Sequence, residues 1–331
     1  MNLAHWLERT AQLYPDRPAI GAGMAVHCNY REFALHASRG AAWLRGAGVQ
    51  PGDRVAFFMA NRPDYLELMW AAWWAGAVVV PINAKLHPRE AAWICGHSQS
   101  TLAFSDDENC DALMAALQQE DQSIPIHTYS GFVLDPRFEP LPVSARTDFD
   151  PAWLFYTSGT TGRPKGVTLA VRQLRLMSLS YLTSVQHVAP GDTMLHPAPL
   201  SHGSGLYHLP YVLRGGVNVV PASGGFDGEE TLALAAHWRN ASFFAAPTMV
   251  RRLVEAVKTQ QVRPDALATI VYGGGPMYLA DIEEALQVVG PHFAQIYGQG
   301  ECPMTITVLP RDVINDREQP HRRERLASVG F

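Results

Sequence analysis

Hydrophobic and polar positions alternate in blocks along the chain. Asp53 to Met59 is a short apolar run, Asp64 to Trp74 has the length and pattern of a helix, and Val78 to Ile82 is a second apolar run. Gly76 closes the expected helix just before that second run. A strand, a helix and a strand in this order are typical of a parallel sheet. The first part of the chain is therefore predicted to be Rossmann-like or flavodoxin-like.

The alternation continues through the rest of the chain with one interruption. A helix at Pro88 to Cys95 and a strand at Leu102 to Phe104 extend the first block, and Pro, Asp and Ser then predict a connector between about residues 121 and 150. Six further strands are predicted, at Trp153 to Tyr156, Thr193 to Ala198, Val217 to Val220, Ser242 to Ala245, Thr269 to Tyr272 and Phe293 to Tyr297. Helices are predicted between most of them, at Glu229 to Arg239, Met249 to Val257 and Leu279 to Val288. We expect an α/β protein with subdomains at residues 1–150 and 151–331.

Composition narrows the class of protein. With 331 residues, 47% hydrophobic and 17% charged, the chain can bury a sizeable core. A net charge of -5 without a basic stripe argues against a nucleic-acid partner. The apolar run Leu68 to Val80 is too short to span a bilayer, and Met1 to Arg9 begins an amphipathic helix rather than a secretory signal. The cysteines form no C-x-x-C pair, which predicts reduced thiols and a cytoplasmic protein; they are Cys28, Cys95, Cys110 and Cys302.

One segment after a predicted strand has the chemistry of a polyphosphate site. Tyr156 to Val167 reads Y-T-S-G-T-T-G-R-P-K-G-V. Its glycines permit close backbone approach, its hydroxyls and amides donate to phosphate oxygens, and Lys165 adds a positive charge. A Walker A loop is disfavoured, because Pro164 precedes the lysine and Gly166 follows it where Ser or Thr is needed. A plain polar connecting loop is the alternative, although such loops seldom have this density of residues in this order.

This segment resembles T-S-G-T-T-G-x-P-K-G, the signature of the adenylate-forming superfamily of acyl-CoA ligases, peptide-synthetase adenylation domains and luciferases. Further segments match the family in order. Pro199 to Gly205 resembles P-L-x-H-x-x-G, and Gly273 to Pro276 is similar to the loop that lies along the adenine. Tyr297 to Glu301 resembles Y-G-x-T-E, with Gly300 where the family commonly has Thr. Ala75 to Asn83 matches a family core segment that serves packing.

The resemblance implies a role for each motif residue. The Tyr297 ring would stack on adenine, Glu301 and Thr157 would hold Mg²⁺, and His202 and Glu301 would be the catalytic residues. His202 would gate the acyl pocket or hold the substrate carboxylate. The implied ATP-binding residues are Thr157, Ser158, Gly159, Thr160, Thr161, Gly162, Lys165, Gly273, Gly274, Gly275, Pro276, Tyr297, Gly298, Gln299 and Gly300. The implied acyl-pocket residues are His202, Gly203, Ser204, Pro247, Thr248, Met249, Tyr272, Gly273, Gln299, Met304 and Thr305.

The resemblance also implies a reaction. The substrate carboxylate would attack the α-phosphorus of ATP to give an acyl-AMP, and the thiol of CoA would then displace AMP, so ATP, Mg²⁺ and CoA are expected. Pro199 to Gly205 and Ala245 to Met249 lack the aspartate that pairs an amino-acid substrate, which favours a neutral or apolar acid. Transfer to a carrier protein and a non-catalytic nucleotide- or acyl-binding half-enzyme stay open as alternatives. The expected partners are small molecules, and a homodimer is left open.

The resemblance covers essentially the whole chain but stops early. Family members continue past this point to an aspartate that grips the ribose, a hinge and a small domain with a lysine that drives adenylation. The expected fold is therefore the N-terminal domain of an adenylate-forming enzyme, two stacked Rossmann- or flavodoxin-like βαβ subdomains, with the terminal β-barrel subdomain and the C-terminal lid missing or truncated. The chain, which ends at Phe331, is expected to bind ATP weakly and to adenylate poorly.

Overall fold

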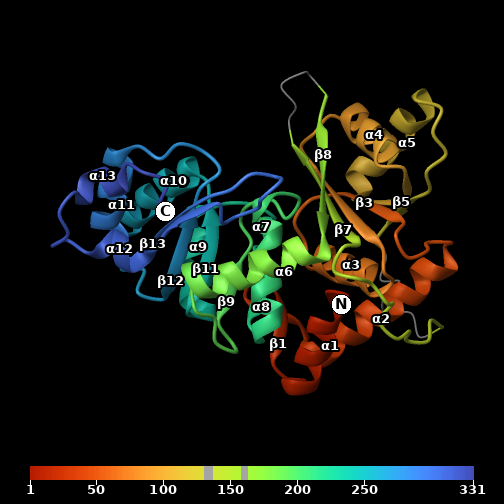
Figure 1. The fold of residues 1–331 in the computed structure, drawn as a ribbon, viewed down its shortest axis with the longest axis horizontal. Helices are drawn as coiled ribbons and strands as arrows, with labels where there is room; N and C mark the ends of the chain where they lie inside the picture. The colour runs from red at the N-terminus through yellow and green to blue at the C-terminus, as the bar shows by residue number, and fades with distance from the viewer. Residues whose placement is uncertain (130–136, 158–162) are drawn as a thin grey trace. The chain divides into compact units, whose positions relative to one another are not determined.

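Two mostly parallel sheets organise the chain (Figure 1). The structure is a computed structural model that describes residues 1–129, 137–157 and 163–331. The six-stranded sheet contains β3 (Arg54–Met59), β4 (Val78–Asn83), β5 (Ser100–Ser105), β6 (Ile126–Thr128), β7 (Pro151–Thr157) and β8 (Lys165–Ala170). Its spatial order is β6-β5-β3-β4-β7-β8, with β8 antiparallel to β7. The helices before and between these strands are α1 (Ala4–Leu13), α2 (Tyr30–Gly46), α3 (Pro63–Trp74), α4 (Pro88–His97) and α5 (Asp107–Gln119).

The second sheet has eight strands in the order β14-β13-β12-β11-β9-β10-β1-β2. They are β1 (Pro18–Ala22), β2 (Ala25–Asn29), β9 (Thr193–Leu195), β10 (Val217–Val220), β11 (Ala241–Ala245), β12 (Leu267–Tyr272), β13 (Phe293–Tyr297) and β14 (Thr307–Leu309). The later helices are α6 (Val171–Ser180), the π-helix η2 (Tyr181–Val185), α7 (Gly203–Leu206), α8 (His208–Arg214), α9 (Gly228–Trp238), α10 (Pro247–Gln260), α11 (Leu279–Val288), α12 (Arg311–Asn315) and α13 (Arg322–Leu326). The predicted α/β class with parallel-rich sheets is confirmed.

The described chain divides into two compact units that are not continuous in sequence. The first unit comprises Met1–Arg17, Cys28–Arg175 and Leu200–His202, and the second comprises Pro18–His27, Leu176–Pro199 and Gly203–Phe331. The strand β7, which follows the predicted connector, pairs with β4 in the six-stranded sheet. The subdomain boundary at residue 150 stays a prediction.

The central strands β3 and β4 of the six-stranded sheet are buried on both faces in the first unit. On β3, Phe58 faces the core formed with α4 and α5, whereas the neighbouring Phe57 packs on Tyr65 of α3 with ring centroids 5.6 Å apart. Neighbouring side chains of a strand point to opposite faces, so a sheet covered on both sides needs continuous apolar runs. This burial explains why the sequence of β3 and β4 is apolar without alternation.

The second unit has its main core between the sheet and three amphipathic helices. The helices α9, α10 and α11 contribute Leu232, Leu253 and Ile282 to a cluster with the strand residues Phe243 and Ile270. In Figure 1 these helices lie beside β11 and β12, and α8 packs on β9 and β10. No described helix has the length and hydropathy that a membrane crossing requires, and none of the four cysteines, all of them described, forms a disulfide.

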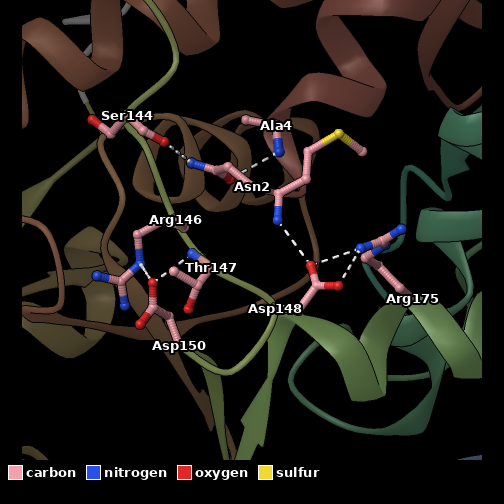
Figure 2. A network of polar contacts seen from close by, with 9 residues as sticks. Asn2, Ala4, Ser144, Arg146, Thr147, Asp148, Asp150 and Arg175 are labelled. Carbon is pink, nitrogen blue, oxygen red and sulfur yellow. Dashed lines mark hydrogen bonds and ion pairs between the residues drawn. The ribbon is translucent and has the colours of Figure 1, made fainter.

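Asn2 holds the start of the chain to the first unit. Its side-chain amide donates to the carbonyl oxygen of Trp73 at 2.7 Å. The same amide donates to the carbonyl oxygen of Ser144 at 2.8 Å (Figure 2). Its Oδ1 accepts from the backbone N–H of Ala4 at 3.0 Å, next to the first turn of α1. Asn2 is only 3% exposed, so these three hydrogen bonds replace water at its side-chain amide.

Ionic contacts lie beside this residue. The Met1 ammonium and Arg175 both contact Asp148, at 2.8 Å and 2.7 Å, and Arg146 lies 3.5 Å from Asp150 (Figure 2). The hydrogen bond from the Met1 ammonium and the contact with Arg175 lower the pKa of Asp148 from its ordinary value. The last residues of the predicted connector are therefore tied to the first unit by specific contacts.

Asn2→Ala is expected to lower the free energy of unfolding by about 2 kcal/mol, because it removes two hydrogen bonds to backbone carbonyls and the one that the Ala4 N–H donates at the start of α1. Urea denaturation measures the change. Asn29 also caps a helix, accepting from Glu32 N–H at 2.9 Å, but it does so at an exposed position. Asn29→Ala should therefore cost about 1 kcal/mol. Equal losses for the two variants would contradict the assignment of the larger role to Asn2.

Candidate functional site

The predicted site segments of the second unit leave the same edge of its sheet. The strands β11, β12 and β13 are neighbouring parallel strands, so their carboxyl ends lie side by side. They are followed by Pro247–Met249, Gly273–Pro276 and Gly298–Glu301. Ligands of open α/β sheets bind at this edge, where loops and helix N-termini expose backbone donors. The structure thus brings together three segments that the sequence singled out.

The three consecutive glycines after β12 differ in whether the backbone requires glycine at their position. A Cβ on Gly273 would lie 2.6 Å from the carbonyl oxygen of Ile296, so only glycine allows this approach of the two strands. Gly274 has a φ of +75°, a left-handed conformation that favours glycine. A Cβ on Gly275 would meet Pro247 at an ordinary 3.7 Å. The first two glycines are required by the backbone, and the third lies beside the start of α10 with room for a ligand or a side chain.

The segment after β13 is a tight turn that fixes Tyr297. A Cβ on Gly298 would lie 2.5 Å from the backbone nitrogen of Met304, and Met304 itself has a φ of +65°. The N–H of Gln299 donates to the Cys302 carbonyl at 3.0 Å, and the Gln299 side-chain amide donates to the Tyr297 hydroxyl at 2.7 Å. Tyr297 is 38% exposed. The turn therefore presents an aromatic ring whose hydroxyl is held and whose surface is accessible.

The carboxylate of Glu301 is exposed in the same turn, next to the buried Gly300. One carboxylate, completed by substrate oxygens and water, is a usual protein contribution to Mg²⁺ binding. The donor chemistry of Glu301 therefore fits the predicted metal. Gly300 has no hydroxyl, so the contact that a threonine would make at this position is absent from the side chain.

In the first unit the phosphate-loop motif spans the connection between β7 and β8. Thr157 is the register partner of Lys165, and Tyr156 is the partner of Gly166. Thr157 is half-buried and Lys165 is exposed. The motif residues Ser158, Gly159, Thr160, Thr161 and Gly162 lie outside the described residues. The described part of the motif places a hydroxyl and an ammonium group on adjoining strands.

His202 lies near β7 in the first unit. Its ring is exposed, with its centroid 6.2 Å from that of Phe155, two residues before Thr157. The N–H of Leu200 donates to Asn61 Oδ1 at 2.8 Å, which fixes the segment that carries the histidine. The structure thus brings His202 to the strand that carries the predicted phosphate contacts.

The predicted acyl-pocket residues of the second unit differ in accessibility. Thr248 and Gln299 are exposed and Met249 is half-buried. Ser204 is 1% exposed, and Tyr272 is fully buried with its hydroxyl donating to Gln295 Oε1 at 3.1 Å. Gly203 and Thr305 are half-buried and Met304 is buried. Tyr272 and Ser204 are core residues in this structure, and their part in a pocket stays a prediction.

The helix α4 contributes contacts to the motif that the sequence did not indicate. Trp93 and His97 lie against Tyr156, with ring centroids 6.4 Å and 5.8 Å from its ring. Two aromatic residues four positions apart on a helix suggest core packing, and no pattern in the sequence connects them with a strand about 60 residues later. Only the sheet order, which places β7 among earlier strands, brings them together.

Known proteins resemble this chain over its whole length. Residues 7–331 match the family model described as AMP-binding enzyme. A feruloyl-CoA synthase of Amycolatopsis sp is 30% identical over 331 residues, which cover 99% of this chain and 64% of the relative. The fatty acid--[acyl-carrier-protein] ligase ScoC of Streptomyces coeruleorubidus is 31% identical over 311 residues, covering 91% of this chain and 58% of the relative. The chain thus spans less than two thirds of the length of these relatives.

A solved structure shares the fold. The N-terminal domain of FACL13 from Mycobacterium tuberculosis superimposes with a TM-score of 0.87 and 22% sequence identity, covering 100% of this chain and 82% of that chain. At this identity the likeness concerns the fold, and it agrees with the N-terminal domain architecture expected from the motifs.

Proposed function

Because the chain belongs to the family of AMP-binding enzymes, we propose that it carries the ATP- and acid-binding part of a ligase. That ligase activates a carboxylic acid as its acyl-AMP and then transfers the acyl group to CoA. The observation that carries the proposal is the edge of the second sheet. There the glycine segment Gly273–Pro276 and the turn Tyr297–Glu301 leave parallel neighbouring strands. Relatives that are acyl- or aryl-CoA ligases support the reaction class.

The strand pair of the first unit supports contact with phosphate. Lys165 is exposed and its register partner Thr157 contributes a hydroxyl. A lysine ammonium and a hydroxyl donate charge-assisted hydrogen bonds to phosphate oxygens. Charge that builds up on the leaving pyrophosphate is stabilised by such fixed donors.

The edge of the second unit supports contact with the base and a metal ion. The accessible Tyr297 ring offers a surface on which adenine would stack, and a Cβ at Gly275, on the neighbouring strand's loop, would meet only Pro247 at 3.7 Å. Glu301 would hold Mg²⁺, which when bound would offset phosphate charge during attack of the carboxylate. Gln299 donates a hydrogen bond to the Tyr297 hydroxyl and so restricts the ring before a base binds. Less side-chain entropy is then lost on binding.

The acid is proposed to be neutral apart from its carboxylate. Pro247–Met249 and Pro199–Gly205 contain no acidic side chain that would pair a substrate ammonium group. His202, exposed beside Phe155, would gate the entry of the acid. CoA is the proposed acceptor. Transfer to a carrier protein is the second candidate, since ScoC, 31% identical, is an acyl-carrier-protein ligase.

Binding of acyl-adenylate mimics tests the proposal on this chain. Acyl sulfamoyl adenosines with an aryl, a fatty acyl or an aminoacyl group are titrated calorimetrically. One of the neutral mimics is expected to bind about tenfold more tightly than AMP, because the acyl group adds apolar contact, and the aminoacyl mimic is expected to lose that gain. Preference for the aminoacyl mimic, or no gain from any acyl group, would refute the proposed acid class.

A further inference from the structure

The helix α4 holds the tyrosine that directly precedes Thr157. His97, its last residue, lies with Nδ1 2.8 Å from the Tyr156 hydroxyl. Trp93, one turn earlier, stacks on the His97 ring, with centroids 4.5 Å apart and an interplanar angle of 19°. Tyr156 is only 8% exposed and belongs to the core formed with this helix. Its hydroxyl is therefore fixed by a helix side chain.

Tyr156 in turn sets the space available to the neighbouring strand. Its register partner is Gly166, the residue after Lys165. A Cβ at Gly166 would lie 2.8 Å from Tyr156 Cζ and 3.1 Å from its hydroxyl oxygen, so the ring lies directly across the glycine backbone. Groups packed this closely cannot move independently. A shift of the Tyr156 ring would therefore shift the start of β8, where Lys165 lies.

The same helix contacts the other end of the motif. The guanidinium carbon of Arg163 lies 5.9 Å from the centroid of the Trp93 ring, within the range of a cation–π contact. The side chains of α4 therefore contact two residues of the motif, Tyr156 and Arg163. Burial raises the pKa of Tyr156 to about 12, so its hydroxyl keeps its proton at neutral pH.

We propose that His97 and Trp93 are positioning residues for the nucleotide, which hold Tyr156 against Gly166 so that Thr157 and Lys165 keep the spacing that phosphates require. The inference rests on the proposed function, because the spacing of Thr157 and Lys165 matters for binding only if the chain binds ATP. The two side chains act through Tyr156 and Gly166 on the strand pair that would contact the phosphates. Donors held in place before binding lose less entropy when the ligand arrives, so loosening them weakens binding.

The first test measures positioning without any nucleotide. Amide hydrogen exchange in β8 is compared between the wild type, His97→Ala and His97→Asn. Alanine removes the contact of His97 with the Tyr156 hydroxyl and leaves that of Ser98, whereas asparagine places an amide close to the position of Nδ1. Exchange is expected to be about fivefold faster in His97→Ala and close to wild type in His97→Asn. Arg89→Ala, an exposed position on the same helix, is the control. Equal exchange in all four proteins would overturn the proposal.

The second test measures Mg·ATP affinity in Tyr156→Phe, which deletes only the hydroxyl. Affinity is expected to fall about fivefold, His97→Ala should match it, and His97→Asn should restore it, all at unchanged ligand-free secondary structure. Faster exchange in β8 with unchanged affinity would show a merely structural contact and would also overturn the proposal. A wild-type chain that binds no Mg·ATP would refute the proposed function instead, and the exchange comparison would still decide whether His97 positions the strand pair.

Discussion

Gly298→Ala is expected to weaken Mg·ATP binding by about tenfold and to lower the free energy of unfolding by about 2 kcal/mol. The new Cβ would lie 2.5 Å from the Met304 nitrogen and 2.9 Å from its Cα. These are backbone atoms, so no side-chain rotation relieves the overlap. The turn must open, and with it the contact in which the Ile306 N–H donates to the Tyr297 carbonyl at 2.8 Å. The Tyr297 ring then loses the orientation in which adenine is proposed to stack on it.

Calorimetric titration and urea denaturation measure the two effects of this substitution. Gly225→Ala is the matched control, because a Cβ at Gly225 meets nothing within 4 Å. It should leave both quantities unchanged to within about 0.5 kcal/mol. If Gly298→Ala bound Mg·ATP as tightly as Gly225→Ala, the turn would have no part in nucleotide binding.

His36→Ala is expected to lower the free energy of unfolding by about 3 kcal/mol, the largest loss of stability that we anticipate from a single truncation outside the site. His36 Nδ1 lies 2.6 Å from Glu67 Oε1, and the Tyr129 hydroxyl donates to Glu67 Oε2 at 3.0 Å. The Glu67 side chain is fully buried. Removing the histidine leaves a buried carboxylate with one hydrogen-bond partner fewer, which costs more than the lost contact itself.

The exposed pair His321–Glu324 is the control for this prediction, since its side chains are 72% and 76% exposed and 2.7 Å apart. His321→Ala should cost at most about 0.5 kcal/mol. Combining His36→Ala with Glu67→Gln should recover part of the loss, because an amide is cheaper to bury than a carboxylate. A double variant no more stable than His36→Ala alone would contradict the role given to the buried charge.

Elements with a strong local pattern could be predicted from the sequence. The strands Val217–Val220 and Phe293–Tyr297 and the helix Leu279–Val288 lie where their apolar periodicity indicated. Their boundaries depend on nearby glycine and proline residues and on the local pattern of apolar residues, all of which can be read from a single sequence.

Elements defined by distant partners were missed. The strand β1 pairs with β10, about 200 residues later in the chain, and β2 lies next to β1 at the edge of the sheet. The strand β8 is a mostly exposed partner of β7. The predicted strand Thr193 to Ala198 ends earlier, at Leu195. Short strands of this kind have little pattern of their own, because their conformation is stabilised by neighbours that the local sequence does not reveal.

The site was predictable as a set of segments, but its geometry was not. Motif letters indicate Thr157, Lys165 and Tyr297, yet they do not reveal that Gly273 is required by close strand packing and Gly275 is not. Nor do they indicate His97, because its contact with Tyr156 depends on the sheet order. These facts follow from tertiary packing, which brings together residues far apart in the sequence.

The proposed function requires that this chain bind ATP through its motif residues. Calorimetric titration of Mg·ATP into the wild type, Lys165→Ala and Lys258→Ala measures that binding. Lys258 carries the same charge but lies in α10, bound to Glu284 at 2.7 Å. We predict saturable binding to the wild type and to Lys258→Ala, and about tenfold weaker binding to Lys165→Ala. No saturable binding, or equal affinity in all three proteins, would contradict ATP binding through the motif.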